Sequence, residues 1–401
     1  MRAVFFQRSM PKIITTLALK KLWSNAVYAP TAPLAFKALP EPPLPGPKGV
    51  RVRNEACGIC ASDLHIAYVD IDPMVHPAAL PGDDRIFLGH EVVSTVEEVG
   101  PEVTSLQPGD KVLMQSRFLG PTCSSQDIAP PCGHCAQGNY VRCENRHADK
   151  GEVGIGGGWG DGYTAHEAEL WKLPDGLTQE QALLIEPFAC SLRAVLRRLP
   201  APGDKVLVVG CGIIGLGVLQ CLRAAAPEAD VYALARYPQQ IERAESYGAT
   251  VLGKGDVLEM TAETTGASLF AGDFGNRTLL GGFDLIIDCV GNGNTIQQSL
   301  RMARAGGAVN IVGVNLHTVK VDLTPVWHQE VTLLGAVGHG MDELQGEAKD
   351  SFDRVAEWFL EGKLNADKLI THRFRLEDWK EAMQTSSNKK SGCIKVIFDY
   401  E

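Results

Sequence analysis

The chain has 401 residues, 45% of them apolar, and this is enough for about two domains that each bury a core. The formal net charge of −10 argues against nucleic acid or an anionic membrane as partner, because both reward clustered Lys and Arg, so small molecules are expected as ligands. The apolar run from Met1 to Phe6 is too short for a secretory signal, and the eleven cysteines therefore predict reduced, metal-binding thiols in a cytoplasmic protein.

The first 47 residues predict a strand, a helix and a proline-rich turn. Met1 to Phe6 predicts the strand and Pro40 to Pro47 the turn. The segment from Ile13 to Val27 predicts the helix, because five apolar residues share one face at helical spacing: Leu19, Leu22, Trp23, Ala26 and Val27. Lys20 and Lys21 interrupt any apolar run long enough to cross a bilayer, so no membrane span is expected. A lid over the substrate, a subunit contact and an interfacial helix all fit this segment.

A metal-binding pattern follows the next predicted strand, Val50 to Arg53. The stretch from Cys57 to His65 reads C-G-I-C-A-S-D-L-H, and the sequence Gly-His-Glu ends farther along at Glu91. A zinc ion prefers thiolate sulfur or imidazole nitrogen, accepts a carboxylate, and keeps one position open when it does chemistry. The side chains that match this demand are those of Cys60, His90 and Glu91, whose two negative charges neutralise a zinc dication. The C-x-x-C pair of the first stretch also fits a redox dithiol or half of a zinc knuckle.

These motifs resemble the zinc-dependent medium-chain alcohol, polyol and threonine dehydrogenases, whose signatures G-x-C-x-S/T-D-x-H and G-H-E stand here almost letter for letter. The resemblance implies an α/β fold with two domains. It also marks the segment from Ile13 to Val27 as an insertion, because relatives usually reach the proline-rich turn with less chain. Residues 1–195 and 345–401 are expected to form a GroES-like, β-rich catalytic domain, and residues 196–344 a Rossmann domain with a doubly wound parallel sheet.

The resemblance also implies a role for each side chain of the first motif. The residues expected to hold a catalytic zinc are Cys60, His90 and Glu91. Cys57 is then a small buried packing residue. Ser62 and His65 are expected to be catalytic as well, passing the proton of the substrate hydroxyl through the cofactor ribose towards solvent. By analogy with water, whose pKa falls to about 7 on zinc, the metal would lower the pKa of the substrate alcohol.

A second cysteine cluster resembles the structural-zinc lobe of the same family, at about residues 120–147. Its four expected zinc ligands are Cys123, Cys132, Cys135 and Cys143. The family separates the first two cysteines by two residues, whereas eight residues, Ser124 to Pro131, separate them here. Four thiolates on a tetrahedral zinc form a closed site that holds a loop and does no chemistry. The alternatives are loose thiols or two disulfides, and disulfides do not fit a reducing compartment.

The chain then leads into the predicted helix Gln179 to Arg197. In polyol and threonine dehydrogenases a glutamate before proline at this place joins the catalytic zinc or holds its water, so the resemblance makes Glu186 a candidate fourth ligand. A third anion would weaken zinc as a Lewis acid, and exchange of Glu186 with water or substrate is therefore expected. A glutamate before proline also fits the simple end of a loop. Trp159, in a glycine-rich stretch, is a candidate for the substrate pocket.

A dinucleotide-binding pattern begins at the apolar strand Lys205 to Val209. A G-x-G-x-x-G turn follows at once, then a helix to Ala226 and a second strand, Asp230 to Leu234. The glycines allow a tight bend and close approach of the backbone to a pyrophosphate, which faces the helix N-terminus. Because the turn stands in its full strand, turn and helix context, it predicts a cofactor site. The cofactor-binding residues expected there are Gly210, Gly212, Ile213, Ile214 and Gly215.

The end of the second strand favours NADP over NAD. An NAD enzyme usually places Asp or Glu there to bind the ribose hydroxyls, but this chain has Ala235 and Arg236. Without the carboxylate nothing repels a 2′-phosphate, and the guanidinium of Arg236 can bind it bidentately. One such bond contributes about 1.5–3 kcal/mol, a preference of roughly ten- to a hundredfold. The alternative is an NAD enzyme in which Arg236 stacks on adenine.

The remaining sequence predicts the rest of the parallel sheet and a return to the first domain. Further strands are predicted at 248–252, 283–291, 306–313 and 331–337, a helix at 352–360, and a final strand at 394–400. Thr261 to Gly282 is glycine-rich and poorly patterned, and it predicts a loop. Relatives pair the last strand of this sheet across a dimer, so a homodimer or homotetramer is expected.

The sequence therefore predicts an NADP-preferring zinc dehydrogenase that interconverts a secondary alcohol, of polyol or sugar type, with its carbonyl. Two other functions stay open. A zinc-independent quinone or enoyl reductase of the same superfamily would keep the Rossmann turn but would have no reason to place Cys, His and Glu together. A non-catalytic NADPH-binding protein would lack a working proton relay through Ser62 and His65.

Overall fold

The structure is a computed structural model that describes residues 1–72, 84–115, 120–146 and 154–400. Residue 147, the last of the predicted zinc lobe, lies outside these ranges. The chain divides into two compact units, one of Met1–Glu186 with Ala366–Glu401 and one of Pro187–Asn365. The division falls within helix α4 (Gln179–Leu196).

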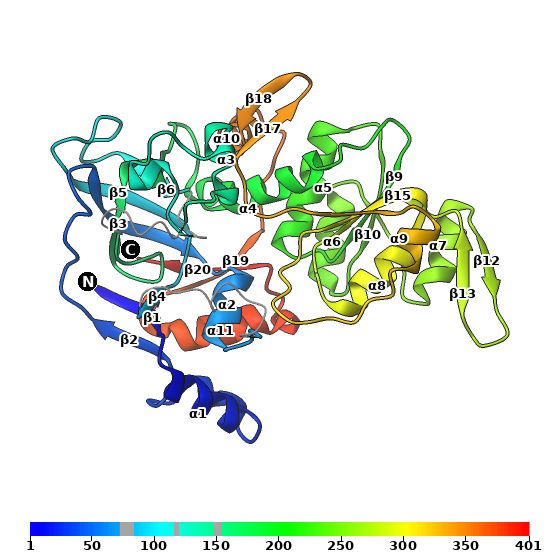
Figure 1. The fold of residues 1–401 in the computed structure, drawn as a ribbon, viewed down its shortest axis with the longest axis horizontal. Helices are drawn as coiled ribbons and strands as arrows, with labels where there is room; N and C mark the ends of the chain where they lie inside the picture. Colours follow the sequence, from blue (N-terminus) through cyan, green and yellow to red (C-terminus); the bar gives the residue numbers. More distant parts are fainter. Residues whose placement is uncertain (73–83, 116–119, 147–153, 401) are drawn as a thin grey trace. The chain divides into compact units, whose positions relative to one another are not determined.

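The first unit is built on two mainly antiparallel sheets, in which, among the described strands, only β19 and β20 pair in parallel (Figure 1). Its strands are β1 (Arg2–Gln7), β2 (Leu34–Ala38), β3 (Gly49–Gly58), β4 (Arg85–Phe87), β5 (Glu91–Val99), β6 (Lys111–Met114), β7 (Gly162–His166), β8 (Leu170–Lys172), β19 (Ile370–Phe374) and β20 (Lys395–Asp399). The larger sheet has the order β19-β20-β3-β5-β6-β8, with β7 also paired to β3, and the smaller has the order β2-β1-β4. Valines fill buried positions of the central strands β3 and β5, because β-branched side chains pack well on a pleated surface. Val50, Val52, Val92 and Val96 all belong to the buried core.

Short helices connect these strands. They are α1 (Met10–Lys20), η1 (Ser24–Tyr28), α2 (Ala61–Ala67), η4 (Ser124–Gln126), α3 (Gly133–Ala136), η5 (Tyr140–Arg142), η6 (Glu167–Glu169), η7 (Leu376–Asp378), α11 (Trp379–Ser387) and η8 (Lys389–Ser391). In the part of the chain that the structure describes, every helix is too short or too polar to span a bilayer.

The inserted segment differs from the predicted single helix at 13–27. Helix α1 begins earlier, with Pro11 in its first turn, and ends at Lys20, and η1 follows after an extended residue, Trp23. The expected shared face does not form, because Leu22 and Trp23 are 90% and 50% exposed whereas Ala26 and Val27 are buried. The prediction of one shared apolar face was wrong, because the extended backbone at residue 23 separates α1 from η1 and turns one helix relative to the other.

The insertion packs against the residue that ends α2. Lys20 Nζ donates a hydrogen bond to the carbonyl of Tyr68 at 2.6 Å, and the hydroxyls of Tyr28 and Tyr68 lie 2.9 Å apart. Helix α2 carries Ser62 and His65, so the insertion supports the helix of the predicted proton relay.

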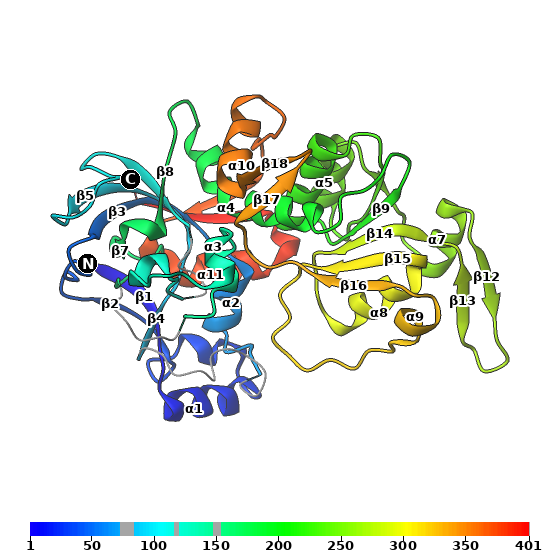
Figure 2. The ribbon, with the colours of Figure 1, turned by 45° about the horizontal axis from the view of Figure 1, so that its top comes forward.

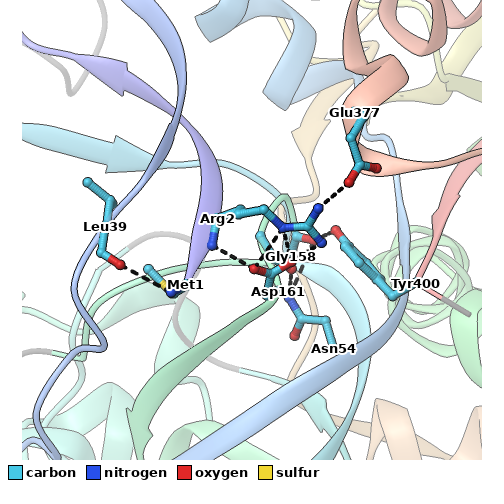
Figure 3. Close-up of polar contacts among 9 residues, drawn as sticks. Met1, Arg2, Leu39, Asn54, Gly158, Asp161, Glu377 and Tyr400 are labelled. Carbon is cyan, nitrogen blue, oxygen red and sulfur yellow. Dashed lines mark hydrogen bonds and ion pairs between the residues drawn. The ribbon is translucent and has the colours of Figure 1, made fainter.

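Residues 157–161 form a glycine-rich segment that passes over the sheet and is called the glycine-rich crossing below. Residues from distant parts of the chain bind it through hydrogen bonds and an ion pair (Figure 3). Arg2 Nη2 pairs with Asp161 Oδ1 at 2.8 Å, which ties the N-terminal strand to the crossing. Asn54 Nδ2 donates to a glycine carbonyl of the crossing at 2.6 Å, and the hydroxyl of Tyr400 donates to another. The crossing therefore has a fixed path over the sheet.

The second unit is a six-stranded parallel sheet with helices. Its strands are β9 (Lys205–Val209), β10 (Asp230–Leu234), β11 (Thr250–Val251), β12 (Ser268–Ala271), β13 (Arg277–Leu280), β14 (Phe283–Asp288), β15 (Ala303–Ile311), β16 (Thr332–Gly335), β17 (Met341–Leu344) and β18 (Glu347–Asp350). Its other helices are α5 (Ile213–Ala225), α6 (Pro238–Ser246), α7 (Val257–Thr265), α8 (Gly293–Met302), α9 (Thr324–His328) and α10 (Ser351–Leu360). Figure 2 shows β14, β15 and β16 side by side in this sheet.

The strand order β11-β10-β9-β14-β15-β16 identifies the doubly wound arrangement. Strand β9 is apolar and buried at each of positions 206 to 209, as expected for a parallel strand covered on both faces. The predicted fold class, a β-rich domain with a doubly wound parallel-sheet domain, is confirmed.

The predicted loop from Thr261 to Gly282 is wrong. The segment contains the end of α7 and an antiparallel hairpin of β12 and β13, which projects from the second unit in Figures 1 and 2. Asp256 caps α7 by accepting hydrogen bonds from two backbone N–H groups, and Gly266 ends the helix in a left-handed conformation with φ of 76°. Four of the five glycines of this segment thus end or connect regular elements, because they supply the positive φ that the turns require.

Candidate metal centre and cofactor site

Neighbouring strands bring three predicted metal ligands together. Gly58 at the end of β3 pairs with Glu91 at the start of β5, so the residues just beyond these positions meet at one edge of the sheet. The ligand atoms of Cys60, His90 and Glu91 all lie within 4.8 Å of one another. Glu91 is buried and the other two are partly buried, an arrangement that fits a small cation with limited access to water.

Asp63 contacts both loops that carry these ligands. Its side chain is 3% exposed, Oδ1 accepts a hydrogen bond from Gly89 N at 2.9 Å, and Oδ2 accepts one from Cys60 N at 3.1 Å. Its Oδ1 also lies 3.7 Å from Nδ1 of His90. One carboxylate therefore fixes the backbone of both ligand loops and the ring of the histidine, which leaves Nε2 of His90 for a metal ion.

Neighbouring charges in this group shift the pKa values of His90 and Asp63 in the direction opposite to the effect of burial. Burial by itself lowers the pKa of His90, but the negative charges of Asp63 and Cys60 outweigh it and raise the pKa well above the usual value. Burial likewise raises the pKa of Asp63, but His90 and two backbone donors lower it below the ordinary range. A cation is therefore strongly favoured here, and a metal ion can take the place of the imidazole proton.

Glu91 forms a buried ion pair with Lys395, the first residue of β20. Both side chains are about 2% exposed or less, and the Nζ atom contacts Oε2 of Glu91. The ammonium also donates to the carbonyl of Ile59 at 3.1 Å. Burial lowers the pKa of Lys395, but the charges of Glu91 and Cys60 raise it above its ordinary value. Among the described residues, Oε2 of Glu91 has no other polar partner.

The predicted relay residues lie on α2, directly after Cys60. Ser62 and His65 stand three positions apart, so they share one face of this helix. Nδ1 of His65 lies 3.0 Å from Oδ2 of Asp70, and the histidine is partly exposed. The imidazole is thus oriented by a carboxylate on one side and open to a second partner on the other.

The structure does not bring Glu186 into the group of three ligands. Its side chain is 7% exposed, and its charge contributes to the raised pKa of Lys395, so it lies near the same buried ammonium. Its role as a fourth zinc ligand stays a prediction.

Trp159 is a core residue, which corrects its expected place in a substrate pocket. It is 1% exposed and packs edge-on against Phe398, with ring centroids 5.2 Å apart. Its neighbour Gly158 donates to the carbonyl of Gly89 at 2.8 Å, and a Cβ on Gly89 would meet the Trp159 ring at 2.5 Å. The glycine-rich crossing thus supports the loop that carries His90.

The four cysteines of the second cluster also converge. The sulfur atoms of Cys123, Cys132, Cys135 and Cys143 all lie within 4.8 Å of one another. Sγ of Cys123 and Sγ of Cys143 are 3.7 Å apart, far beyond the length of a disulfide bond, and all four cysteines are unpaired. A tetrahedral zinc with bonds of about 2.3 Å requires sulfur separations of about 3.8 Å, so the cluster fits this ion.

The longer spacing after Cys123 is absorbed by local structure. Helix η4 and a left-handed residue, Asp127 with φ of 51°, turn the chain so that Cys132 N donates to Sγ of Cys123 at 3.3 Å. Asn145 Nδ2 donates to the same sulfur at 3.2 Å. Backbone donors from Glu144 and Cys135 lower the pKa of the Cys132 thiol to about 6, which favours the thiolate that metals bind.

The predicted cofactor turn has the geometry of a tight strand-to-helix connection. Gly210 follows β9 with φ of 88°, and a Cβ there would meet Val290 at 2.4 Å. A Cβ on Gly215 would meet the carbonyl oxygen of Gly210 at 1.9 Å. Gly212 precedes α5 and faces open space, and Ile213 and Ile214 begin the helix. The turn therefore presents backbone N–H groups of the helix N-terminus to an anionic group.

Arg236 is free to bind an anion. Strand β10 ends at Leu234, and Ala235 and Arg236 follow it. The guanidinium is exposed and lies 5.6 Å from the ring centroid of Tyr237. Within the described ranges it has no acidic partner that would neutralise it.

Comparison with known proteins shows what this architecture is. Residues 46–175 match the alcohol dehydrogenase GroES-like domain, and residues 214–357 match the zinc-binding dehydrogenase domain. The chain is 30% identical to (R,R)-butanediol dehydrogenase of Bacillus subtilis over 363 residues, which cover 89% of this chain and 94% of the relative. The chain belongs to the zinc-dependent medium-chain dehydrogenase family.

Two further similarities agree with this assignment. The chain is 28% identical to a sorbitol dehydrogenase of Arabidopsis thaliana over 89% of its length and 90% of the relative. The crystal structure of 2R,3R-butanediol dehydrogenase from Bacillus subtilis superposes with a TM-score of 0.71 at 26% identity, covering 100% of this chain and 99% of that chain. The protein is thus an enzyme of the alcohol dehydrogenase type, which interconverts an alcohol and a carbonyl compound.

Two residues of this dehydrogenase carry contacts that sequence reasoning did not assign. Asp63 stands inside the first motif, at the third position of α2, where a carboxylate can accept a hydrogen bond from the N–H of Cys60. Its position in the motif could therefore have predicted the hydrogen bond to Cys60. Lys395 interrupts the apolar strand at 394–400, but a single lysine in a strand usually points to solvent. Only the packing of β20 beside β3 shows that it points to Glu91.

Proposed function

We propose that this dehydrogenase uses a catalytic zinc and prefers NADP to oxidise a secondary alcohol of polyol or sugar type, and to reduce the corresponding carbonyl. The convergence of Cys60, His90 and Glu91 carries the proposal. A thiolate, an imidazole and a carboxylate leave one position of a tetrahedral zinc open for substrate. The relatives named for butanediol and sorbitol support a substrate with several hydroxyl groups.

The three ligands would hold zinc, which supplies a Lewis acid that polarises the substrate oxygen. Asp63 keeps the ring of His90 and the backbone of Cys60 in position, so that little reorganisation accompanies binding. The Rossmann turn binds the cofactor pyrophosphate through backbone N–H groups, and the cofactor carries the hydride.

Ser62 and His65 move the proton of the substrate hydroxyl. When Nδ1–H of a neutral His65 ring donates to Asp70, as their 3.0 Å separation allows, Nε2 carries the free lone pair and can accept a proton. Ser62 has both a donor and two acceptor sites, so it can take the substrate proton and pass its own onward. The relay ends at a partly exposed imidazole from which the proton reaches water.

Metal analysis followed by cofactor turnover tests the proposed function. We expect two zinc ions per chain, and NADP-dependent oxidation of diols and polyols that a chelator abolishes and added zinc restores. Chelator-insensitive turnover would favour a quinone or enoyl reductase. Zinc-loaded protein that is inert towards a panel of alcohols, polyols and sugars would favour a non-catalytic NADPH-binding protein.

Replacement of Arg236 tests the cofactor preference. Arg236→Ala should raise the KM for NADPH by about ten- to a hundredfold and leave the KM for NADH within about twofold, because only NADPH carries the 2′-phosphate. Arg236→Lys keeps the charge without the bidentate fork and should fall between the two. Steady-state kinetics with both cofactors measure the effect, and equal increases in the two KM values would indicate that Arg236 stacks on adenine.

We also infer that the dehydrogenase forms a homodimer or homotetramer through the edge of its parallel sheet. Strand β16 ends the sheet, and Leu333 and Val337 beside this edge are 39% and 50% exposed. An exposed edge strand with apolar side chains is a template for pairing with another copy. Leu333→Lys should shift the mass measured by light scattering towards the monomer, and an unchanged mass would place the interface elsewhere.

The cysteines support the cytoplasm as the compartment. All eleven are outside disulfide bonds, including the four that lie close enough to share a zinc ion. An oxidising environment would favour disulfide bonds between cysteines that lie this close together. A reducing one keeps them as thiols, whose thiolate form binds zinc. We therefore infer a reducing compartment for the protein.

A further inference from the structure

Lys395 is a buried cation at the candidate metal centre that the proposed chemistry does not use. Lysine is almost never fully buried unless it is paired, and this side chain is 2% exposed. Its partners are the carboxylate of Glu91 and the carbonyl of Ile59, and Ile59 immediately precedes the ligand Cys60. The ammonium therefore contacts both places that supply metal ligands, the loop after β3 and the start of β5.

Three adjacent strands leave a gap for this pair. Gly58 on β3 stands opposite Glu91 of β5 on one side and Ile397 of β20 on the other. A Cβ on Gly58 would meet Oε2 of Glu91 at 2.1 Å and Cε of Lys395 at 2.7 Å. The backbone of Gly58 has an ordinary strand conformation, so the space for the ion pair explains the glycine better than any need for a positive φ.

The lysine changes the charge of the centre. Cys60 and Glu91 contribute two negative charges as thiolate and carboxylate, which would make a site with a zinc dication neutral. Lys395 adds one positive charge in direct contact with one of these ligands. In a poorly hydrated site such a charge acts strongly, because effective dielectric constants there are far below that of water. Lys395 therefore makes the loaded centre one charge more positive than its ligands and the buried carboxylate of Asp63 would leave it.

We propose that Lys395 is a positioning residue that holds one carboxylate oxygen of Glu91, competes with the metal ion for that ligand, and makes the loaded centre one charge more positive. In the absence of metal, the lysine compensates the buried carboxylate and keeps it in place. With metal bound, it leaves Glu91 a single oxygen for coordination and favours an oxyanion over a neutral alcohol as substrate oxygen. The inference rests on the proposed zinc-dependent function.

Charge-removing variants of Lys395 test this role. Lys395→Met keeps most of the side-chain volume, and Lys395→Gln also keeps a hydrogen-bond donor for Glu91. Competition with a chromophoric chelator should show at least about tenfold tighter zinc binding at the catalytic site in both variants, since a cation that competes for Glu91 has been removed. The apparent pKa in the pH profile of kcat should rise by about one unit. Lys395→Arg keeps the charge and should stay near the wild type in both measurements.

The proposal has a clear contrary outcome. If Lys395 serves only packing or hydrogen bonding, folded Lys395→Gln will show wild-type zinc affinity and a wild-type pH profile, and the proposed role is then overturned. Weaker zinc binding in Lys395→Gln would also overturn it, because competition predicts the opposite sign. Failure of the zinc function itself is recognised separately. In that case Cys60→Ser, in a chain that keeps Lys395, would leave zinc content and turnover unchanged.

Discussion

Cys60→Ser should remove one of two zinc ions per chain and lower kcat/KM for alcohol oxidation by about a thousandfold or more. The sulfur of Cys60 lies within 4.8 Å of the ligand atoms of both His90 and Glu91, so no other described side chain replaces it in the group. A Lewis acid contributes several kcal/mol to stabilising charge in the transition state, and each 1.36 kcal/mol is a factor of ten in rate. Zinc analysis and steady-state kinetics on the same preparation measure both effects.

Cys57 offers a matched control for this substitution. It lies three residues from Cys60, but it is fully buried, and burial raises the pKa of its thiol well above the ordinary value. Such a thiol is a poor metal ligand and a poor redox partner. Cys57→Ala should therefore keep both zinc ions and most activity. Loss of zinc from Cys57→Ala, with zinc retained in Cys60→Ser, would contradict the ligand assignment.

Cys135→Ser should remove the other zinc ion and destabilise the fold without a specific loss of chemistry. In a closed four-cysteine site, the free energy of metal binding contributes to folding. A loss of several kcal/mol lowers the Tm of a domain of this size by roughly 10 °C. Below the new Tm, kcat per folded molecule should stay within about threefold of the wild type, because these sulfurs are a separate group from the candidate catalytic centre.

Calorimetry, zinc analysis and kinetics on Cys135→Ser distinguish this outcome from others. Cys190→Ser is the control, because Cys190 belongs to neither cluster, and it should leave the zinc content at the wild-type value. An unchanged zinc content in Cys135→Ser would show that this cluster is not a zinc site. Loss of kcat with unchanged Tm would show that it takes part in the reaction.

The regular elements around the cofactor turn were predictable because they depend on local patterns. A buried apolar strand, a glycine turn and a helix follow one another between Lys205 and Ala225, and each needs only its own residues. The segment at 261–282 was not predictable in the same way. Its glycines resemble a loop in the sequence, but Gly266 and Gly275 only terminate a helix and close a hairpin. Composition does not distinguish these uses of glycine.

The sequence by itself determined the family motifs, the two cysteine-rich clusters and the cofactor turn, because these depend on residue types at short spacings. Only the tertiary structure decided how the metal centre is surrounded. Asp63 beneath His90, Trp159 in the core and Lys395 against Glu91 all depend on which strands lie side by side. The ion pair joins residues 304 positions apart through β3, β5 and β20, and no local pattern records such a contact. Long-range strand pairing therefore determines the charge of the site.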